Sequence, residues 1–144
     1  MAKSIKDIEQ EIIDEFSLFD DWMDKYQYII EMGQSLPGLP EADKVEDHIV
    51  NGCVSQVWLK ADTQAGEIAY AADSDAVITK GLIALLMRVL SGHRPQEILD
   101  ADLAFVDAVG IRQHLSPNRS NGLNAMIKKM KYIALAHQAR EEQS

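Results

Sequence analysis

Two short segments with strand character flank a turn in the stretch VWLKADTQAGEIAYAA, residues 57–72. Residues 57–62 and 67–72 alternate or run apolar, and Gln64, Ala65 and Gly66 lie between them. This pattern around a glycine-containing turn is typical of a β-hairpin. The stretch therefore predicts two antiparallel strands, and we expect a third short strand at residues 48–50, just before them.

A helix that is apolar on most of its circumference follows the hairpin, with the sequence AVITKGLIALLMRVL at residues 76–90. A helix of this kind is usually buried at the centre of a domain. We expect Asp73, Ser74 and Asp75 to cap its start and Ser91-Gly92 to end it.

Further helices are indicated on both sides of this region by apolar side chains at helical spacing. The first is expected at residues 5–16, and the second starts after a cap at Asp20 and stops at Gly33. Short helices follow at 95–99 and 103–109, and a long one starts at Ser116-Pro117. Its apolar stripe comprises Leu123, Met126, Ile127, Met130, Ile133 and Ala134.

Together these elements predict an α+β fold, with a small antiparallel three-stranded sheet flanked by helices. The length of 144 residues fits a single domain, residues 1–144. We expect its core at about residues 20–138, followed by a polar C-terminal tail that frays from residue 140 onward.

Composition narrows the class of protein. The net charge of −9, from 23 acidic and 14 basic residues, disfavours nucleic acid as a partner. No apolar run is long enough to span a membrane, and the N-terminus has no feature of a secretion signal. A cytoplasmic protein is therefore expected, in agreement with its one unpaired cysteine.

That cysteine, Cys53, lies in the segment NGCVSQVW, residues 51–58. Lone cysteines are most often inert and buried. Here, however, Gly52 permits unusual backbone geometry, and Asn51, Ser55 and Gln56 argue against a core strand. Reactive groups concentrate in such loops, so Cys53 is a candidate nucleophile.

Arg119 is the second candidate, because it occupies the first turn of a helix, where the helix dipole favours acidic residues instead. An arginine near a thiol lowers the thiol pKa and enriches the thiolate. The alternative is a structural ion pair with a loop carboxylate. Gly122, also early in this helix, suggests close packing there, and Lys128, Lys129 and Lys131 extend the basic character of the region.

Two other classes of function fit the residues less well. A stand-alone cysteine hydrolase needs a base and a group that orients it, and His48, five residues before Cys53, is a candidate base without a visible partner. A metal or cluster scaffold needs about three or four soft ligands, whereas the chain offers one cysteine and four scattered histidines.

Several fragments together resemble the SufE family, the sulfur acceptors of iron–sulfur cluster assembly. They are Gly52 to Trp58, Ser74-Asp75-Ala76, Lys80-Gly81-Leu82, Leu115-Ser116-Pro117 with Arg119, and Gly122-Leu123. The resemblance runs from about Trp22 to Ile133 in matching order and spacing.

The resemblance implies a fold similar to IscU-like scaffold proteins and no cofactor or metal of its own. It also implies that Cys53 accepts sulfur as a persulfide from a SufS-type cysteine desulfurase. The protein would stimulate that enzyme and pass the sulfur to a SufBCD-type scaffold. Arg119 matches an arginine in the family's Ser/Thr-Pro-x-Arg segment. A CsdE-type acceptor for a related desulfurase is the alternative. The chain would then be a transfer partner and not an enzyme, and a homodimer is compatible with this role.

Overall fold

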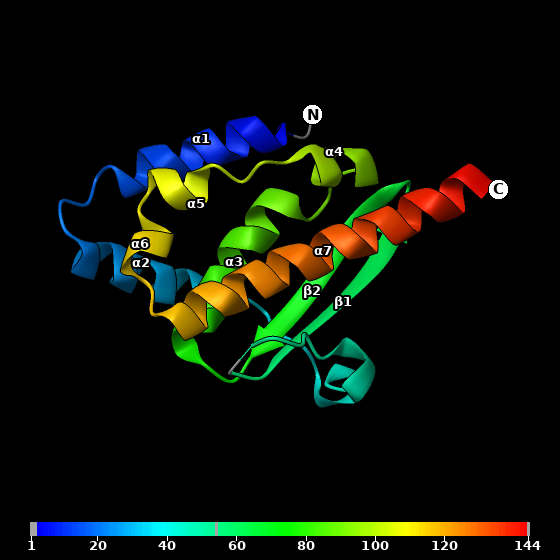
Figure 1. Cartoon of the computed structure of the whole chain (residues 1–144), viewed down its shortest axis with the longest axis horizontal. Coiled ribbons are helices and arrows are strands. Elements are labelled where there is room, and N and C mark those ends of the chain that lie inside the picture. The colour runs from blue at the N-terminus through cyan, green and yellow to red at the C-terminus, as the bar shows by residue number, and fades with distance from the viewer. Residues whose placement is uncertain (1–2, 54, 144) are drawn as a thin grey trace.

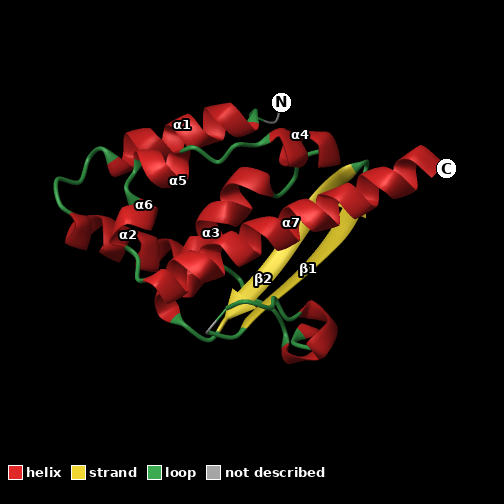
Figure 2. Cartoon of the chain, viewed as in Figure 1, coloured by secondary structure: helices red, strands yellow, loops and turns green. Residues whose placement is uncertain are grey.

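The computed structural model describes residues 3–53 and 55–143. Seven α-helices and one hairpin make up this part of the chain (Figures 1 and 2). In order, the elements are α1 (Ile5–Phe16), α2 (Trp22–Gln34), the 3-10 helices η1 (Glu41–Asp43) and η2 (Glu46–His48), β1 (Val57–Gln64), β2 (Glu67–Ser74), α3 (Val77–Leu90), α4 (Pro95–Asp100), α5 (Phe105–Ala108), α6 (Ile111–His114) and α7 (Pro117–Gln143).

The hairpin forms as the sequence predicts. Strands β1 and β2 pair antiparallel from Val57 opposite Ser74 to Gln64 opposite Glu67. The two residues between them, Ala65 and Gly66, have φ values of 53° and 81°. Positive φ at both positions matches the twist of the flanking strands, which is why such two-residue turns are favoured in hairpins.

The third strand predicted at residues 48–50 is wrong. Ile49 makes only an isolated bridge to Trp58, and η2 occupies residues up to His48. After Val50 the backbone turns at Gly52, where φ is +95°, so the pairing with β1 does not extend beyond Ile49 and Val50. The sheet in the described residues therefore has two strands, within an α+β arrangement.

Helix α3 is the central element, as its apolar composition predicts. It packs against α1, α2, α7 and β2, and the buried cluster around it extends from Ile5 in α1 to Ala134 in α7. The core therefore begins before residue 20, because α1 contributes Ile5, Ile12 and Phe16. Tyr70 of β2 connects the hairpin to α7 by donating to the carbonyl oxygen of Met130 at 2.7 Å.

Helix α2 differs from its prediction at both ends. Its N-cap is Asp21, which accepts from the backbone N–H of Asp24 at 2.9 Å, and not Asp20. Gly33 does not stop the helix, which continues to Gln34. Instead, a Cβ at Gly33 would lie 2.6 Å from the backbone nitrogen of Gly81, so the glycine is needed where α2 crosses α3.

Other differences are local. The Ser74 hydroxyl accepts from the N–H of Ala76, the N-cap residue of α3, at 3.2 Å, whereas no side chain of residues 73–75 accepts from the first turn itself. The four-residue helix α6 was not predicted. Helix α7 starts at Pro117, as predicted, but continues to Gln143 instead of fraying from Arg140.

Candidate functional site

Cys53 follows the turn at Gly52 and approaches the first part of α7. A Cβ placed on Gly52 would lie 3.3 Å from the Cβ of Ala125. The Cys53 side chain is partly buried and packs at the edge of the core. The expectation that Cys53 lies in a loop opened by a glycine is thus confirmed.

The thiol forms part of the wall of a cavity of about 370 Å³ between α3 and α7. From α3 the cavity is lined by Thr79, Leu82, Ile83 and Leu86, and from α7 and the residue before it by Ser116, Asn118, Arg119, Gly122, Leu123 and Met126. Ser55 completes the lining on the loop side. The floor is apolar, whereas hydroxyl, amide and guanidinium groups come from the ends of the two helices.

Gly122 provides the closest contact of the thiol with α7. The Sγ atom of Cys53 lies 3.7 Å from the Gly122 carbonyl oxygen, within reach of a weak S–H···O hydrogen bond. Cys53 thus packs beside Gly122 as expected, although a Cβ at that position would meet the sulfur at 3.6 Å, an ordinary contact distance.

Arg119 lines the same cavity as Cys53, so the structure brings the two candidate residues together. Its backbone N–H donates to the hydroxyl oxygen of Ser116 at 3.3 Å, which caps α7. Its exposed side chain forms no ion pair with any side chain that the structure describes. The alternative of a structural ion pair with a loop carboxylate therefore finds no support in this part of the chain.

Burial raises the pKa of the Cys53 thiol. Among the described residues, no charged group contributes a compensating decrease. The expected lowering of the thiol pKa by Arg119 is therefore not seen in this conformation, and its effect on the thiolate stays a prediction. The resting site favours the protonated thiol.

The loop is anchored to the hairpin at Gln56, three residues after the cysteine. The backbone N–H of Gln56 donates to the carboxylate of Asp75 at 3.1 Å, and the hydroxyl of Ser74 donates to the carbonyl oxygen of Gln56 at 2.9 Å. On the other side of the loop, the N–H of Val50 donates to the Val57 carbonyl at 2.9 Å. These bonds fix both ends of the loop and leave its tip against α7.

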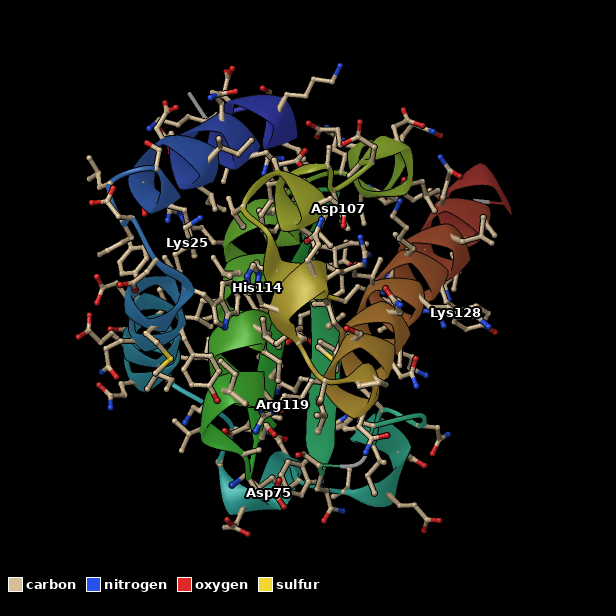
Figure 3. The ribbon with its side chains drawn as sticks, turned by 60° about the vertical axis from the view of Figure 1, so that its left-hand side comes forward. Lys25, Asp75, Asp107, His114, Arg119 and Lys128 are labelled. Carbon is tan, nitrogen blue, oxygen red and sulfur yellow. The ribbon has the colours of Figure 1, made fainter. Side chains whose placement is uncertain are left out.

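The other candidates lie elsewhere. His48 does not line the Cys53 cavity, and its Nδ1 lies 2.6 Å from the carbonyl oxygen of Asp43. The basic residues of α7 do not form one surface. Figure 3 shows Arg119 and Lys128 on different sides of the helix, and Lys131 donates to the carbonyl oxygen of Ala101 after α4.

Thr79 and Asn118 are lining residues that the sequence did not reveal. Both are ordinary polar residues near a helix start, and nothing in their spacing connects them with Cys53 before α3 and α7 are packed together. Across residues 3–53 and 55–143, no group of three or more His, Cys, Asp or Glu side chains could hold a metal ion. In the same residues, no helix is both long and apolar enough to cross a bilayer.

Residues 10–134 match the family model described as "SufE: Fe-S metabolism associated domain". The chain belongs to the SufE family. The match includes Cys53, Arg119 and the α3 side of the cavity, so the whole candidate site lies within the SufE domain.

Similar proteins agree with membership of the SufE family. An uncharacterized SufE-like protein of Rhizobium meliloti (strain 1021) is 40% identical over 126 residues, which are 84% of this chain and 90% of that protein. One from Rhizobium etli is 41% identical over 127 residues, covering 84% and 85%. A third, from Synechocystis sp., is 37% identical over 127 residues, covering 88% and 80%.

The fold is similar to a solution structure of a hypothetical protein from Thermus thermophilus. The TM-score is 0.76, with 92% of this chain and 96% of that chain covered, at 20% identity. This likeness shows the fold alone. The expected similarity of the SufE fold to IscU-like scaffold proteins stays a prediction.

Proposed function

We propose that the chain is a sulfur acceptor and carrier in iron–sulfur cluster assembly, with Cys53 as the atom-carrying residue. The observation that supports this most is the position of Cys53 on a sheltered cavity shared with Arg119, in a chain of the SufE family. The sulfur donor is a SufS-type cysteine desulfurase, and the recipient is a SufBCD-type scaffold.

The transfer is a thiol exchange at sulfur. The Cys53 thiolate attacks the outer sulfur of the persulfide on the desulfurase cysteine. The bond between the two donor sulfurs breaks, the desulfurase cysteine leaves as a thiolate, and Cys53 becomes the persulfide. No external oxidant or reductant is consumed. Because the donor cysteine is cleared for another turnover, acceptance also stimulates the desulfurase.

The single cysteine suits a carrier of this kind. A second nearby thiol would attack the Cys53 persulfide, form a disulfide and release sulfide. Partial burial against α7 limits the access of soluble reductants to the loaded sulfur. In this role the chain is a transfer partner, with no turnover of its own.

Arg119 is the residue that we assign to stabilising negative charge on sulfur during transfer. It is the charged residue among those that line the cavity, and its side chain forms no ion pair with the described residues. A guanidinium in this position can favour the thiolate or the persulfide anion once the loop brings the sulfur toward it.

The test is incubation with a purified SufS-type desulfurase and cysteine, followed by intact mass spectrometry. Wild type gains one sulfur atom on Cys53, and Cys53→Ser gains none while keeping the same circular dichroism spectrum. A wild-type protein whose mass does not change under these conditions would contradict the proposal. Repeating the assay with a CsdA-type desulfurase tests the alternative of a CsdE-type acceptor. The desulfurase that is the natural donor is expected to reach half-maximal transfer at a lower concentration of this protein.

A further inference from the structure

A groove runs along α7 beside the segment that leads to Cys53. It consists of two neighbouring hollows of about 440 and 500 Å³, which share Lys129 and Tyr132 in their walls. We call it the α7 groove. Its walls are α7 between Ala125 and Arg140 and, opposite, parts of β1 and of the segment between Asp43 and Gly52.

The α7 groove is a different surface from the cavity under Cys53. Arg119 and Lys128 are nine positions apart, which places them about half a turn apart around the helix axis; Figure 3 shows this separation. At 1.5 Å per residue, the wall from Ala125 to Arg140 is about 22 Å long. One end of the groove reaches Asn51 and Gly52, directly before the cysteine.

Large apolar side chains are exposed along this part of α7. Tyr132 is 64% exposed and Leu135 is 52% exposed. Tyr132 lines both hollows together with the apolar Ala125 and Ile49 of the first, and Leu135 follows it by about one helical turn at the edge of the groove. Exposed apolar side chains beside a long hollow are typical of a surface that binds another protein.

The end of the α7 groove near Cys53 is positively charged. No acidic residue lines this hollow, whereas Lys128 and Lys129 both do. Neither lysine forms an ion pair with the side chains described, and the Nζ atom of Lys129 lies 5.8 Å from the centre of the Tyr132 ring. At the far end, Arg140 is accompanied by acids, of which Asp43 pairs with Lys60 at 3.2 Å.

We propose that the α7 groove docks an acidic amphipathic segment of the sulfur donor, with its carboxylates against Lys128 and Lys129 and its apolar side chains against Tyr132 and Leu135. This inference rests on the proposed function. Opposite charge and apolar contact select such a segment, and the position of the groove next to Gly52 holds the donor beside the cysteine loop. Because the groove touches neither the thiol nor Arg119, it contributes to affinity and not to chemistry.

The test measures Cys53 persulfide formation against the concentration of this protein, with a fixed amount of SufS-type desulfurase and excess cysteine. Two double variants, Lys128→Glu with Lys129→Glu and Tyr132→Ser with Leu135→Ser, probe charge and apolar contact separately. Lys6→Glu and Val77→Ser are matched controls, because Lys6 is exposed on α1 and Val77 is 61% exposed at the start of α3. Circular dichroism checks folding of each variant.

We expect both double variants to raise the half-saturating concentration at least tenfold while the maximal rate stays within twofold. The controls, and the rate of Cys53 alkylation by iodoacetamide without a partner, stay at wild-type values. Unchanged half-saturation in both folded double variants would overturn the inference, and so would a wild-type dimer that the same changes dissociate. A wild type that accepts no sulfur at any concentration contradicts the proposed function instead.

Discussion

The Sγ atom of Cys53 rests 3.7 Å from the carbonyl oxygen of Gly122, although the two residues are 69 positions apart. A Cβ at position 122 would lie 3.6 Å from that sulfur, an ordinary contact distance. A glycine or an alanine at position 122 therefore leaves the thiol its resting place, whereas a longer side chain does not.

Substitutions at Gly122 are expected to separate stability from access to the thiol. Gly122→Ala fits and removes a glycine from a helix, so the free energy of unfolding rises by up to about 1 kcal/mol. Gly122→Leu exceeds the space and displaces the cysteine loop, so iodoacetamide alkylates Cys53 at least fivefold faster than in wild type. Urea unfolding and alkylation kinetics measure the two effects. A leucine variant that reacts as slowly as wild type would contradict this interpretation.

The reactivity of Cys53 is expected to rise with pH over a higher range than that of a free cysteine. Burial raises the thiol pKa, so the thiolate fraction at neutral pH is small and increases about tenfold per pH unit below that pKa. The stability linked to this buried proton is present below the unfolded-state pKa and is lost as pH rises through the folded-state pKa. Alkylation rates of the native and urea-unfolded protein from pH 6 to 10 check the order of the two pKa values. Equal midpoints in the two states would be the contrary result.

The carboxylate of Asp75 is expected to restrain the cysteine loop. Asp75→Ala removes the acceptor of the Gln56 N–H but leaves the Ser74 hydroxyl bond to the Gln56 carbonyl intact. We expect several-fold faster alkylation of Cys53, and a loss of about 1 kcal/mol in the free energy of unfolding. The control is Asp20→Ala, another exposed acid, which changes neither quantity. Identical alkylation rates in Asp75→Ala and wild type would show that the anchor does not limit loop opening.

Replacement of Arg119 is expected to affect sulfur transfer and not folding. Its side chain is exposed and forms no ion pair among the described residues, so Arg119→Ala keeps the wild-type free energy of unfolding. The maximal rate of Cys53 persulfide formation falls about tenfold, and Arg119→Lys recovers part of it because a positive charge remains. A wild-type rate in Arg119→Ala would remove the assigned role.

Gly81→Ala is expected to destabilise the protein, although replacing a glycine by alanine within a helix is normally stabilising. A Cβ at Gly81 would lie 2.2 Å from the carbonyl oxygen of Ile29, so α2 must move away from α3. Overpacking of this kind costs about 1–3 kcal/mol. Urea unfolding measures the loss, and Gly122→Ala is the matched control, since that helical glycine has room for a methyl group. Equal stability of Gly81→Ala and wild type would show that the crossing is not tight.

Local patterns predicted the hairpin, the central helix and the start of α7, because each depends on residues close in sequence. Gly66 and the alternation around it suffice for the turn, and Ser116-Pro117 suffices for the helix start. The role of Gly33 could not be found in this way. A glycine at the end of an apolar period resembles a helix stop, and only the packing of α2 on Gly81 shows its actual role.

The sequence indicated which residues to consider for the candidate site, but not the cavity in which they lie. Cys53 and Arg119 were identified, yet the cavity wall from α3 requires the tertiary packing of two helices. The sequence could have shown that the basic residues of α7 lie on different sides of the helix. At 3.6 residues per turn, nine positions place Arg119 and Lys128 about half a turn apart. The single bridge at Ile49 was not, since a strand and a bridge have the same local composition.

The contact between Gly33 and Gly81 has a consequence for the other side of α3. A helix packed backbone to backbone against its neighbour has little freedom to shift. The side of the cavity that α3 forms is therefore rigid. On the opposite side of the cavity, Cys53 lies in a short loop that hydrogen bonds at Val50 and Gln56 fix at its two ends. Under the proposed function, sulfur transfer would therefore require no movement of α3.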